Sequence, residues 1–517
     1  MGGRGGAGQR GEAVCTVRRR QQGQRGEAPT FELKKIRKRE RKMKVRARER
    51  GRERGSGSGA QRVSLLALGL CAIALLCANI CTAREMREQA FEGAGDPWDV
   101  ARNILDGGVS SRVFPGATAI VGGRDGLLFK YSTGRFTYGA KPPFGGNEAM
   151  ASDTVFDLAS LSKVVGTTSV VAWLYENGYL DLDEFVCNDD LLGVAFAQGG
   201  KGNVTIRDCM LHQAGFPPDP MPRYWEPVFG CSGAPLPPQQ SFHCSDRCYE
   251  SVLAQTLDSP PGTKYVYSDL SMITMMFVVG KVILRNNLVQ DDSLLPECSL
   301  YPNNSSVQLQ CQFEAFLRTT IVPSLEKASG SDIHILGYKP EPAYWSYTAP
   351  TGTVAAEKIN VTLQGRVEDG NAEMLGGISG HAGLFSTAQD LSVLMHTLLF
   401  PGLTTDGASS GHTFLNSTTI RLFTTENNNS ISSRALGWNT NDPTVTDRGW
   451  GLSCGNLSAK TFMHLGYTGT QVCGDPVNKV YTVLLTNRVY PTDQGPSIHN
   501  IRQDFHNAVA SIVTKSK

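Results

Sequence analysis

The chain lacks two patterns that would define its class at once. No repeat of fixed period occurs between residues 90 and 517, which excludes solenoids, propellers and other repeat architectures. Cys244 and Cys248 have a spacing compatible with metal binding, but no second Cys/His pair stands at the spacing of a zinc finger. With 40% apolar residues, the chain has enough hydrophobic material for a sizeable core, and one irregular domain over residues 90–517 is the simplest interpretation.

Acidic residues are scarce at the N-terminus. Residues 1–62 contain 20 Lys/Arg and 6 Asp/Glu, whereas the rest of the chain contains 30 and 42. Residues 34–54, with 13 basic residues, have almost no large apolar side chains and cannot bury a core. We expect residues 1–62 to be disordered. On charge alone this segment could serve nuclear localisation or bind nucleic acid or anionic lipid.

Charged residues are absent from residues 63–83, which are rich in Leu, Ala, Ile and Cys. These 21 positions are long enough to cross a bilayer as a helix, and the basic residues before them place the N-terminus in the cytosol. The segment is an uncleaved signal anchor or, alternatively, a signal peptide cleaved near residues 81–83. We therefore expect a single-pass membrane protein with a lumenal or extracellular domain, or a secreted one, and no nucleic-acid partner.

Cysteine usage agrees with an oxidising compartment, because nine of the 13 cysteines follow the apolar segment. Cys298 with Cys311 and Cys454 with Cys473 are plausible disulfides, although the odd total leaves one thiol over and connectivity stays open. Seven Asn-x-Ser/Thr sequons predict a glycoprotein. They begin at Asn203, Asn303, Asn304, Asn360, Asn416, Asn428 and Asn456.

Hydrophobic periodicity predicts a domain whose two ends are regular. Residues 117–121 and 127–131 form a hairpin across an Asp-Gly turn, and apolar positions at helical spacing predict a buried helix over residues 162–176. Near the C-terminus, residues 461–464 and 479–486 resemble strands, and a final helix begins near residue 498. Two Pro-, Gly- or Cys-containing stretches, residues 215–262 and 285–312, are predicted to be loops or surface insertions.

A Ser-x-x-Lys motif stands where the predicted buried helix begins. Ser160 lies near the positive end of that helix, and Lys163, three residues later, faces the same side, so its nitrogen can reach the serine hydroxyl. This placement gives the hydroxyl a local base. The structural alternative is a helix cap with a solvated lysine. A second match, Ser324 with Lys327, has no apolar helix after it and is a poor candidate.

Two further polar motifs follow. Tyr267 and Asp269 stand on a turn that enters the apolar run 272–279, and they are better placed than Tyr301, which lies in a polar insertion. His464 sits on an edge-like strand before Gly466, where two glycines would let a ligand backbone approach closely. His381 competes on pattern alone, but a loop position suits it better.

In this order the three motifs resemble the active-site motifs of the β-lactamase-related serine hydrolases. That family includes class C β-lactamases, penicillin-binding carboxypeptidases, D-aminopeptidases and serine esterases. The resemblance covers about residues 96–512, with the closest blocks at residues 156–165, 205–208, 212–217, 369–372, 376–388 and 485–491.

The resemblance implies an α/β (α+β) fold, in which an antiparallel sheet with flanking helices packs against a mainly helical lobe from about residue 190 to 385. Ser160 would be acylated, while Lys163 and Tyr267 would move its proton. The backbone N–H groups of Ser160 and Tyr467 would form the oxyanion hole. Neither a metal nor another cofactor is implied.

Two departures from the family pattern bear on the substrate. His464 stands where penicillin-binding members usually carry Lys, and Asp269 stands where many carry Asn; with Gly466 these residues would contact substrate. A neutral imidazole attracts a carboxylate less than an ammonium does. We therefore predict hydrolysis of small-molecule or peptide esters or amides, without dedicated antibiotic resistance. The alternative is a non-catalytic scaffold that keeps the fold, and the oligomeric state stays open.

Overall fold

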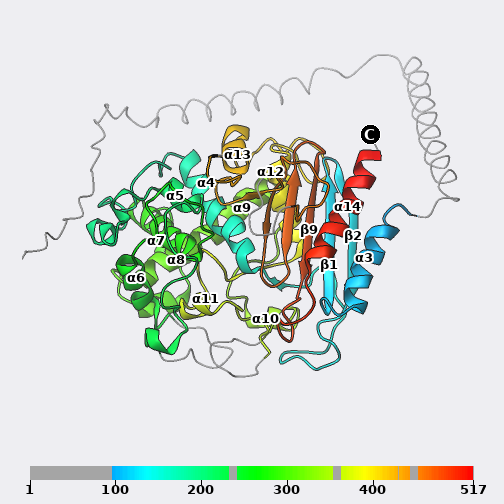
Figure 1. Ribbon diagram of the computed structural model, residues 1–517, viewed down its shortest axis with the longest axis horizontal. Helices are drawn as coiled ribbons and strands as arrows, with labels where there is room; N and C mark the ends of the chain where they lie inside the picture. The colour runs from blue at the N-terminus through cyan, green and yellow to red at the C-terminus, as the bar shows by residue number, and fades with distance from the viewer. Residues whose placement is uncertain (1–95, 232–241, 353–361, 429, 443–451, 516–517) are drawn as a thin grey trace, which may run out of the picture. The chain divides into compact units, whose positions relative to one another are not determined.

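The computed structural model describes residues 96–231, 242–352, 362–428, 430–442 and 452–515 (Figure 1). The predicted basic segment, residues 1–62, and the predicted apolar segment, residues 63–83, lie outside these ranges. Within them, no helix is both long and apolar enough to cross a membrane.

The centre of the domain is an antiparallel sheet with the strand order β2-β1-β9-β8-β7-β6. Because β1 pairs with β9, the two ends of the domain meet in the middle of this sheet, as predicted. The N-terminal hairpin is confirmed, and its turn uses Gly126 at φ +134°, a conformation that favours glycine. The strands are β1 (Gly116–Gly123), β2 (Gly126–Gly134), β6 (Asn439–Thr440), β7 (Phe462–Leu465), β8 (Gln471–Asp475) and β9 (Val480–Thr486).

Helices cover both faces of this sheet. Strand residues alternate between the faces, so Val121 packs in a cluster with α3 (Asp99–Ser110) and α14 (His499–Lys515), whereas Ile120 belongs to the larger core on the other face. That face is covered by α12 (Ala388–Leu399) (Figure 1). Full burial of each such side chain stabilises the fold by roughly 1.5–3 kcal/mol.

A mainly helical lobe forms the other half of the domain, as the family resemblance implied (Figure 1). Its centre is α7 (Asp269–Arg285), which has 13 buried residues and packs against α8 (Ser306–Phe316). The other helices of this half are α4 (Ser169–Glu176), α5 (Ile206–Met210), α6 (Ser245–Ala254), α9 (Val322–Ser329), α10 (Pro342–Trp345) and α11 (Gly370–Met374). The predicted α+β architecture is therefore confirmed.

The prediction of loops over residues 285–312 is wrong from residue 306 onward, because these residues belong to α8, which is buried along its whole length. Glutamines that suggested a surface insertion use their amide nitrogens inside the protein. Gln310 donates from Nε2 to the carbonyl oxygens of Leu375 and Ile378, both at 2.8 Å. These hydrogen bonds offset part of the cost of burying a glutamine, so composition alone misplaced this helix. Within residues 215–262, α6 likewise interrupts a predicted loop.

Three disulfides join described cysteines. The two predicted pairs, Cys298 with Cys311 and Cys454 with Cys473, are both present. Cys231 pairs with Cys244, so the latter belongs to a disulfide and to no zinc site. Among the described residues, Cys209 and Cys248 are free and buried.

The Cys298–Cys311 bond closes a short loop onto α8, and its removal gives a first test. A disulfide that closes a loop of this size stabilises a fold by about 3 kcal/mol. We therefore expect the double variant Cys298→Ala/Cys311→Ala to lose that much in free energy of unfolding. Urea titration under oxidising conditions measures this loss. In reducing buffer, wild type and variant should converge; equal stability in oxidising buffer would show that the bond does not form.

Candidate active site

Ser160 lies on a short 3-10 turn, η1 (Ala159–Leu161), directly after strand β3 (Phe156–Asp157). The preceding residue, Ala159, has φ +47°, a left-handed conformation that costs energy for a residue with a Cβ atom. Asp157 holds this turn, since its Oδ1 accepts a hydrogen bond of 2.8 Å from the Ala159 N–H. The strained turn ends the strand and leaves Ser160 only partly buried.

The single helix predicted over residues 162–176 is instead a π-helix, η2 (Lys163–Thr168), followed by α4. Two hydroxyls stabilise the wider turn by donating to carbonyls five residues back: Thr168 to Lys163 O at 2.8 Å and Ser169 to Val164 O at 3.2 Å. π-Helical turns frequently mark functional sites. Apolar spacing cannot distinguish this geometry from an α-helix, which explains the error.

The Lys163 ammonium is the centre of the site. Its Nζ lies 2.9 Å from Ser160 Oγ, 2.9 Å from the carbonyl oxygen of His381 and 2.7 Å from Asp269 Oδ1, and its side chain is completely buried. Burial lowers the pKa of Lys163, but the charges of Asp269 and Tyr267 outweigh it, so the pKa lies above its ordinary value. The group is therefore an ammonium that donates to the serine.

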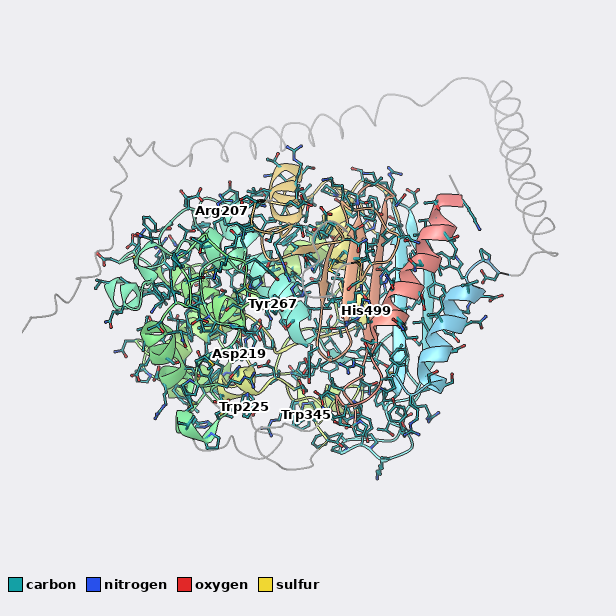
Figure 2. All side chains as sticks on the ribbon, in the orientation of Figure 1. Arg207, Asp219, Trp225, Tyr267, Trp345 and His499 are labelled. Carbon is teal, nitrogen blue, oxygen red and sulfur yellow. A yellow bond between two sulfur atoms is a disulfide. The ribbon has the colours of Figure 1, made fainter. Side chains whose placement is uncertain are left out.

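Tyr267, which is labelled in Figure 2, has two cations and two imidazoles as neighbours. The Lys163 Nζ and the Arg434 guanidinium each lie 5.1 Å from the centre of its ring, within cation–π range. The rings of His212 and His464 lie 4.7 Å and 6.1 Å away, centre to centre. The structure thus brings together Lys163 of the first predicted motif, Tyr267 of the second and His464 of the third.

The turn that carries Tyr267 enters α7, as predicted, and it is held from both sides. Ser268 caps the helix by accepting from the Ser271 N–H, and its own Oγ donates to Pro217 O at 2.7 Å. The Ser268 N–H donates to His212 Nδ1 at 3.2 Å. Asp269 begins the helix and points its carboxylate at Lys163.

His464 lies on β7. It directly follows Phe462 and Met463, the two residues of this strand that pair with β6. Nδ1 faces the Leu465 carbonyl at 2.9 Å and must therefore carry the proton, while Nε2 is buried and has no hydrogen-bond partner among the described residues. Burial and the charges of Arg434 and Lys163 hold the pKa of His464 well below its ordinary value. The imidazole is neutral and offers one acceptor.

The turn after β7 is fastened to the segment before the nucleophile. Thr468 donates to Asp157 O at 2.8 Å, and Thr470 donates to Leu158 O at 2.9 Å. The backbone N–H groups of Ser160 and Tyr467 donate to no other described residue. Free backbone donors are what an oxyanion hole requires, so the predicted role of these two N–H groups stays a prediction.

Gly466 is required by packing within the chain itself, while its contact with a substrate stays a prediction. A Cβ atom at this position would clash with the Thr470 hydroxyl and would approach the Leu158 carbonyl oxygen to 2.6 Å. Glycine is therefore required by the chain's own backbone, where the sequence had suggested room for a ligand. The Tyr467 side chain points elsewhere, since its hydroxyl donates to Asp493.

Asp269, Asp369 and His381 lie together beside Lys163. His381 Nε2 lies 2.9 Å from Asp369 Oδ1, and Ser379 Oγ contacts His381 Nδ1 at 2.8 Å. Burial would raise the pKa of Asp369, but His381 and Lys163 lower it to about 2. Asp269, Asp369 and His381 are close enough to share a cation. Lys163 already compensates their charge, so we assign no metal there.

Sequence reasoning missed several members of this cluster. Arg434 carried no recognisable motif, whereas His212 and Asp369 fell inside blocks noted only for their family resemblance. His381 does lie in a loop, as expected, yet its carbonyl holds Lys163. The second Ser-x-x-Lys match is structural, because Ser324 Oγ donates to Thr320 O within the helical segment.

Comparison with known proteins agrees with this geometry. The profile of the family described as Beta-lactamase matches residues 101–284 and 311–504, which is more than half of the chain. The chain belongs to this family. Its members include serine hydrolases, and the family predicted from the sequence motifs is confirmed.

The relatives span most of the domain. A putative D-alanyl-D-alanine carboxypeptidase of Escherichia coli O157:H7 is 27% identical over 425 residues, covering 78% of this chain and 86% of its own length. An N-acetylmuramyl-L-alanine amidase of Bacillus subtilis (strain 168) is 26% identical over 429 residues, covering 78% and 84%. The crystal structure of a penicillin-binding protein homologue from Caulobacter crescentus superposes with a TM-score of 0.53 at 17% identity, covering 80% and 97%, and shows the shared fold.

The buried Asp157 carboxyl gives a pH-dependent test. Burial raises its pKa to about 7, although the Ala159 and Glu368 N–H groups oppose the shift. Between pH 4 and 7 the folded protein then keeps a proton that the unfolded chain has lost, so the free energy of unfolding falls as pH rises.

We expect Asp157→Asn to remove this dependence, whatever constant loss of stability it causes. Relative to the variant, the free energy of unfolding of wild type should fall by up to about 1.4 kcal/mol for each unit of rising pH in this window. Urea titrations at several pH values measure the slope. Parallel slopes for the two proteins would contradict the assignment.

Proposed function

We propose that the chain is a serine hydrolase that cleaves ester or amide bonds through an acyl-enzyme on Ser160. The observation that carries the proposal is the 2.9 Å contact between Lys163 Nζ and Ser160 Oγ, within a site that also contains Asp269 and Tyr267. A scaffold would not need this cluster of buried charge around one serine, because each buried ionised group has to be compensated.

In the proposed reaction, Ser160 Oγ attacks the substrate carbonyl carbon and its proton passes to the side-chain oxygen of Tyr267. Tyr267 reacts in its phenolate form, which the Lys163 and Arg434 cations beside its ring favour, and becomes a phenol. Lys163, an ammonium without a lone pair, stabilises the developing negative charge. The carbonyl oxygen becomes an oxyanion opposite the N–H groups of Ser160 and Tyr467. The proton returns to the leaving oxygen or nitrogen, and water then hydrolyses the acyl-enzyme by the same steps.

The third motif favours ester or amide substrates over β-lactams. In place of an ammonium, His464 presents a neutral ring whose Nε2 is an acceptor, so it suits an N–H or O–H of the substrate better than a carboxylate. Amide cleavage is the activity that the names of both curated relatives describe. As part of the same proposal, residues 63–83 would anchor or export the domain to the far side of a membrane.

Covalent labelling tests the nucleophile. A fluorophosphonate probe should label wild type and should not label Ser160→Ala, because Ser160 is the proposed nucleophile and the Lys163 ammonium lies against its hydroxyl. The matched control is Ser324→Ala, which alters the other Ser-x-x-Lys motif and should be labelled as wild type is. Equal labelling of Ser160→Ala would contradict the proposal, and inactivity of wild type on p-nitrophenyl esters, D-amino-acid amides and a chromogenic cephalosporin would favour the scaffold.

The phenol of Tyr267 provides a second test. Tyr267→Phe keeps the ring that packs against His212 and removes the hydroxyl, so folding should be retained while kcat/KM falls by roughly 10²–10⁴. Ester hydrolysis and a melting curve measure the two effects. Tyr265→Phe is the control, since Tyr265 also stacks on Arg434 but has no proposed chemical role. Equal losses in the two variants would reject Tyr267 as the proton carrier.

A further inference from the structure

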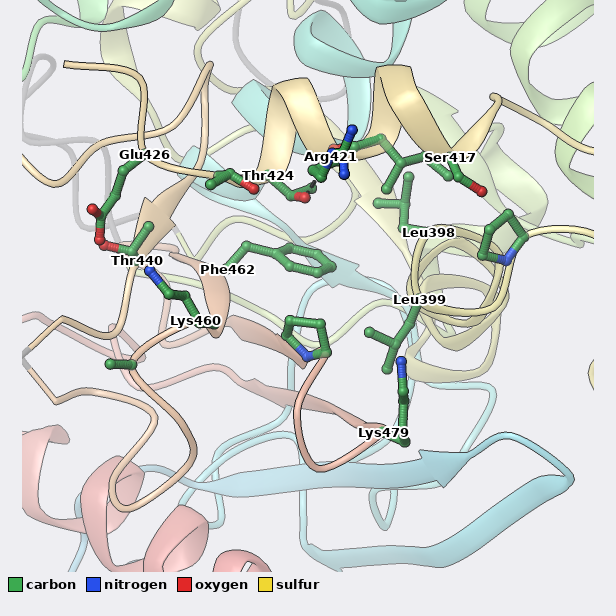
Figure 3. Close-up of a pocket in the computed structure, with 15 residues that line it drawn as sticks. Leu398, Leu399, Ser417, Arg421, Thr424, Glu426, Thr440, Lys460, Phe462 and Lys479 are labelled. Carbon is green, nitrogen blue, oxygen red and sulfur yellow. Dashed lines mark hydrogen bonds between the residues drawn. The ribbon is translucent and has the colours of Figure 1, made fainter. Parts of the chain in front are cut away.

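A hollow lies where α12 ends beside α13 (Ser417–Thr424) and the β6–β7 pair (Figure 3). Its volume is about 460 Å³, within the range of roughly 300–1,000 Å³ typical of small-molecule sites. None of the residues that line it belongs to the candidate active site.

The floor of this hollow is apolar and the rim is basic. Leu398, Leu399, Ile420 and Phe462 are all buried and form the floor. Phe462 is held rigidly from behind, since Trp438 packs edge-on against it at 5.0 Å between ring centres. A hydrocarbon chain laid on this floor would remove apolar surface from water, which is favourable in proportion to the area covered.

Three exposed cations border the floor: Arg421, Lys460 and Lys479 (Figure 3). None of them forms a salt bridge with another residue in the part of the chain that the structure describes. Among the described residues of the lining, the one acid is Glu426, whose pKa is raised by its burial and by Asp442, although the charge of Lys460 opposes the shift. The rim therefore carries an excess of positive charge over an apolar surface.

We propose that this hollow binds a single-chain fatty acid, with the chain on the apolar floor and the carboxylate at Lys479, which lies beside Leu399 (Figure 3). Charge complementarity selects an anion, and Glu426 on the same rim disfavours a second negative charge. A carboxylate carries one charge, whereas a phosphate monoester carries between about 1.5 and 2, so the carboxylate fits better. This site is independent of the proposed hydrolysis.

Calorimetric titration of the full chain with decanoate, below its critical micelle concentration, tests the proposal. We expect saturable binding with one site per chain. Lys479→Gln should weaken the affinity at least about tenfold, because the lost charge-assisted contact contributes more than a neutral one. Thr424→Trp should abolish binding by filling the hollow, since Thr424 lines it. Lys141→Gln, an exposed lysine elsewhere, should leave the affinity unchanged.

Matched ligands and a Ser160→Ala background separate this site from the catalytic one. Decanol should bind more weakly than decanoate, and decanoate should bind Ser160→Ala as tightly as wild type. Tighter binding of decyl phosphate than of decanoate would overturn the carboxylate assignment. The absence of saturable binding by wild type, unchanged affinity in either hollow variant, or loss of binding in Ser160→Ala would overturn the site.

Discussion

A lysine ammonium without solvent contact is unfavourable unless opposite charge and hydrogen-bond acceptors surround it, and Lys163 sets this requirement for the whole domain. Asp269 supplies the charge from the first turn of α7, and the His381 loop supplies a carbonyl. The nucleophile supplies the last contact. Each of these groups comes from a different part of the sequence, so the ion is stable only when the lobes are assembled. Only the assembled fold brings all three partners to the Lys163 ammonium.

The same charge organises the groups that do not touch it. Burial holds the pKa of His464 low together with the charges of Arg434 and Lys163, so a residue that titrates near neutrality in water remains a neutral acceptor here. Both cations also lie 5.1 Å from the centre of the Tyr267 ring. A site with this much positive charge has no need of a further cation at His464. That explains physically how a histidine can occupy the position where the family pattern has lysine.

Strand β7 links the two sites of the domain. Phe462 forms part of the floor of the hollow, and His464, two residues later on the same face of the strand, lies beside Tyr267. The rigid contact of Phe462 with Trp438 fixes this strand against the helical core. The strand end and its following turn are then fastened to the nucleophile segment by Thr468 and Thr470. Sheet, turn and nucleophile therefore form one continuous support.

Local pattern was sufficient for several regular elements and for naming the candidate reactive groups. The hairpin of β1 and β2, strands β7 and β9, and α14 follow from spacing within a few residues, as does the candidate pair Ser160 and Lys163, because periodicity and helix geometry are local properties. The tertiary structure decided what depends on partners distant in sequence. It placed Arg434 and Asp369 in the site, made η2 a π-helix and buried the glutamines of α8. It also showed that Gly466 serves the chain's own backbone. Burial, charge compensation and close approach are relations between segments, and no single segment encodes them.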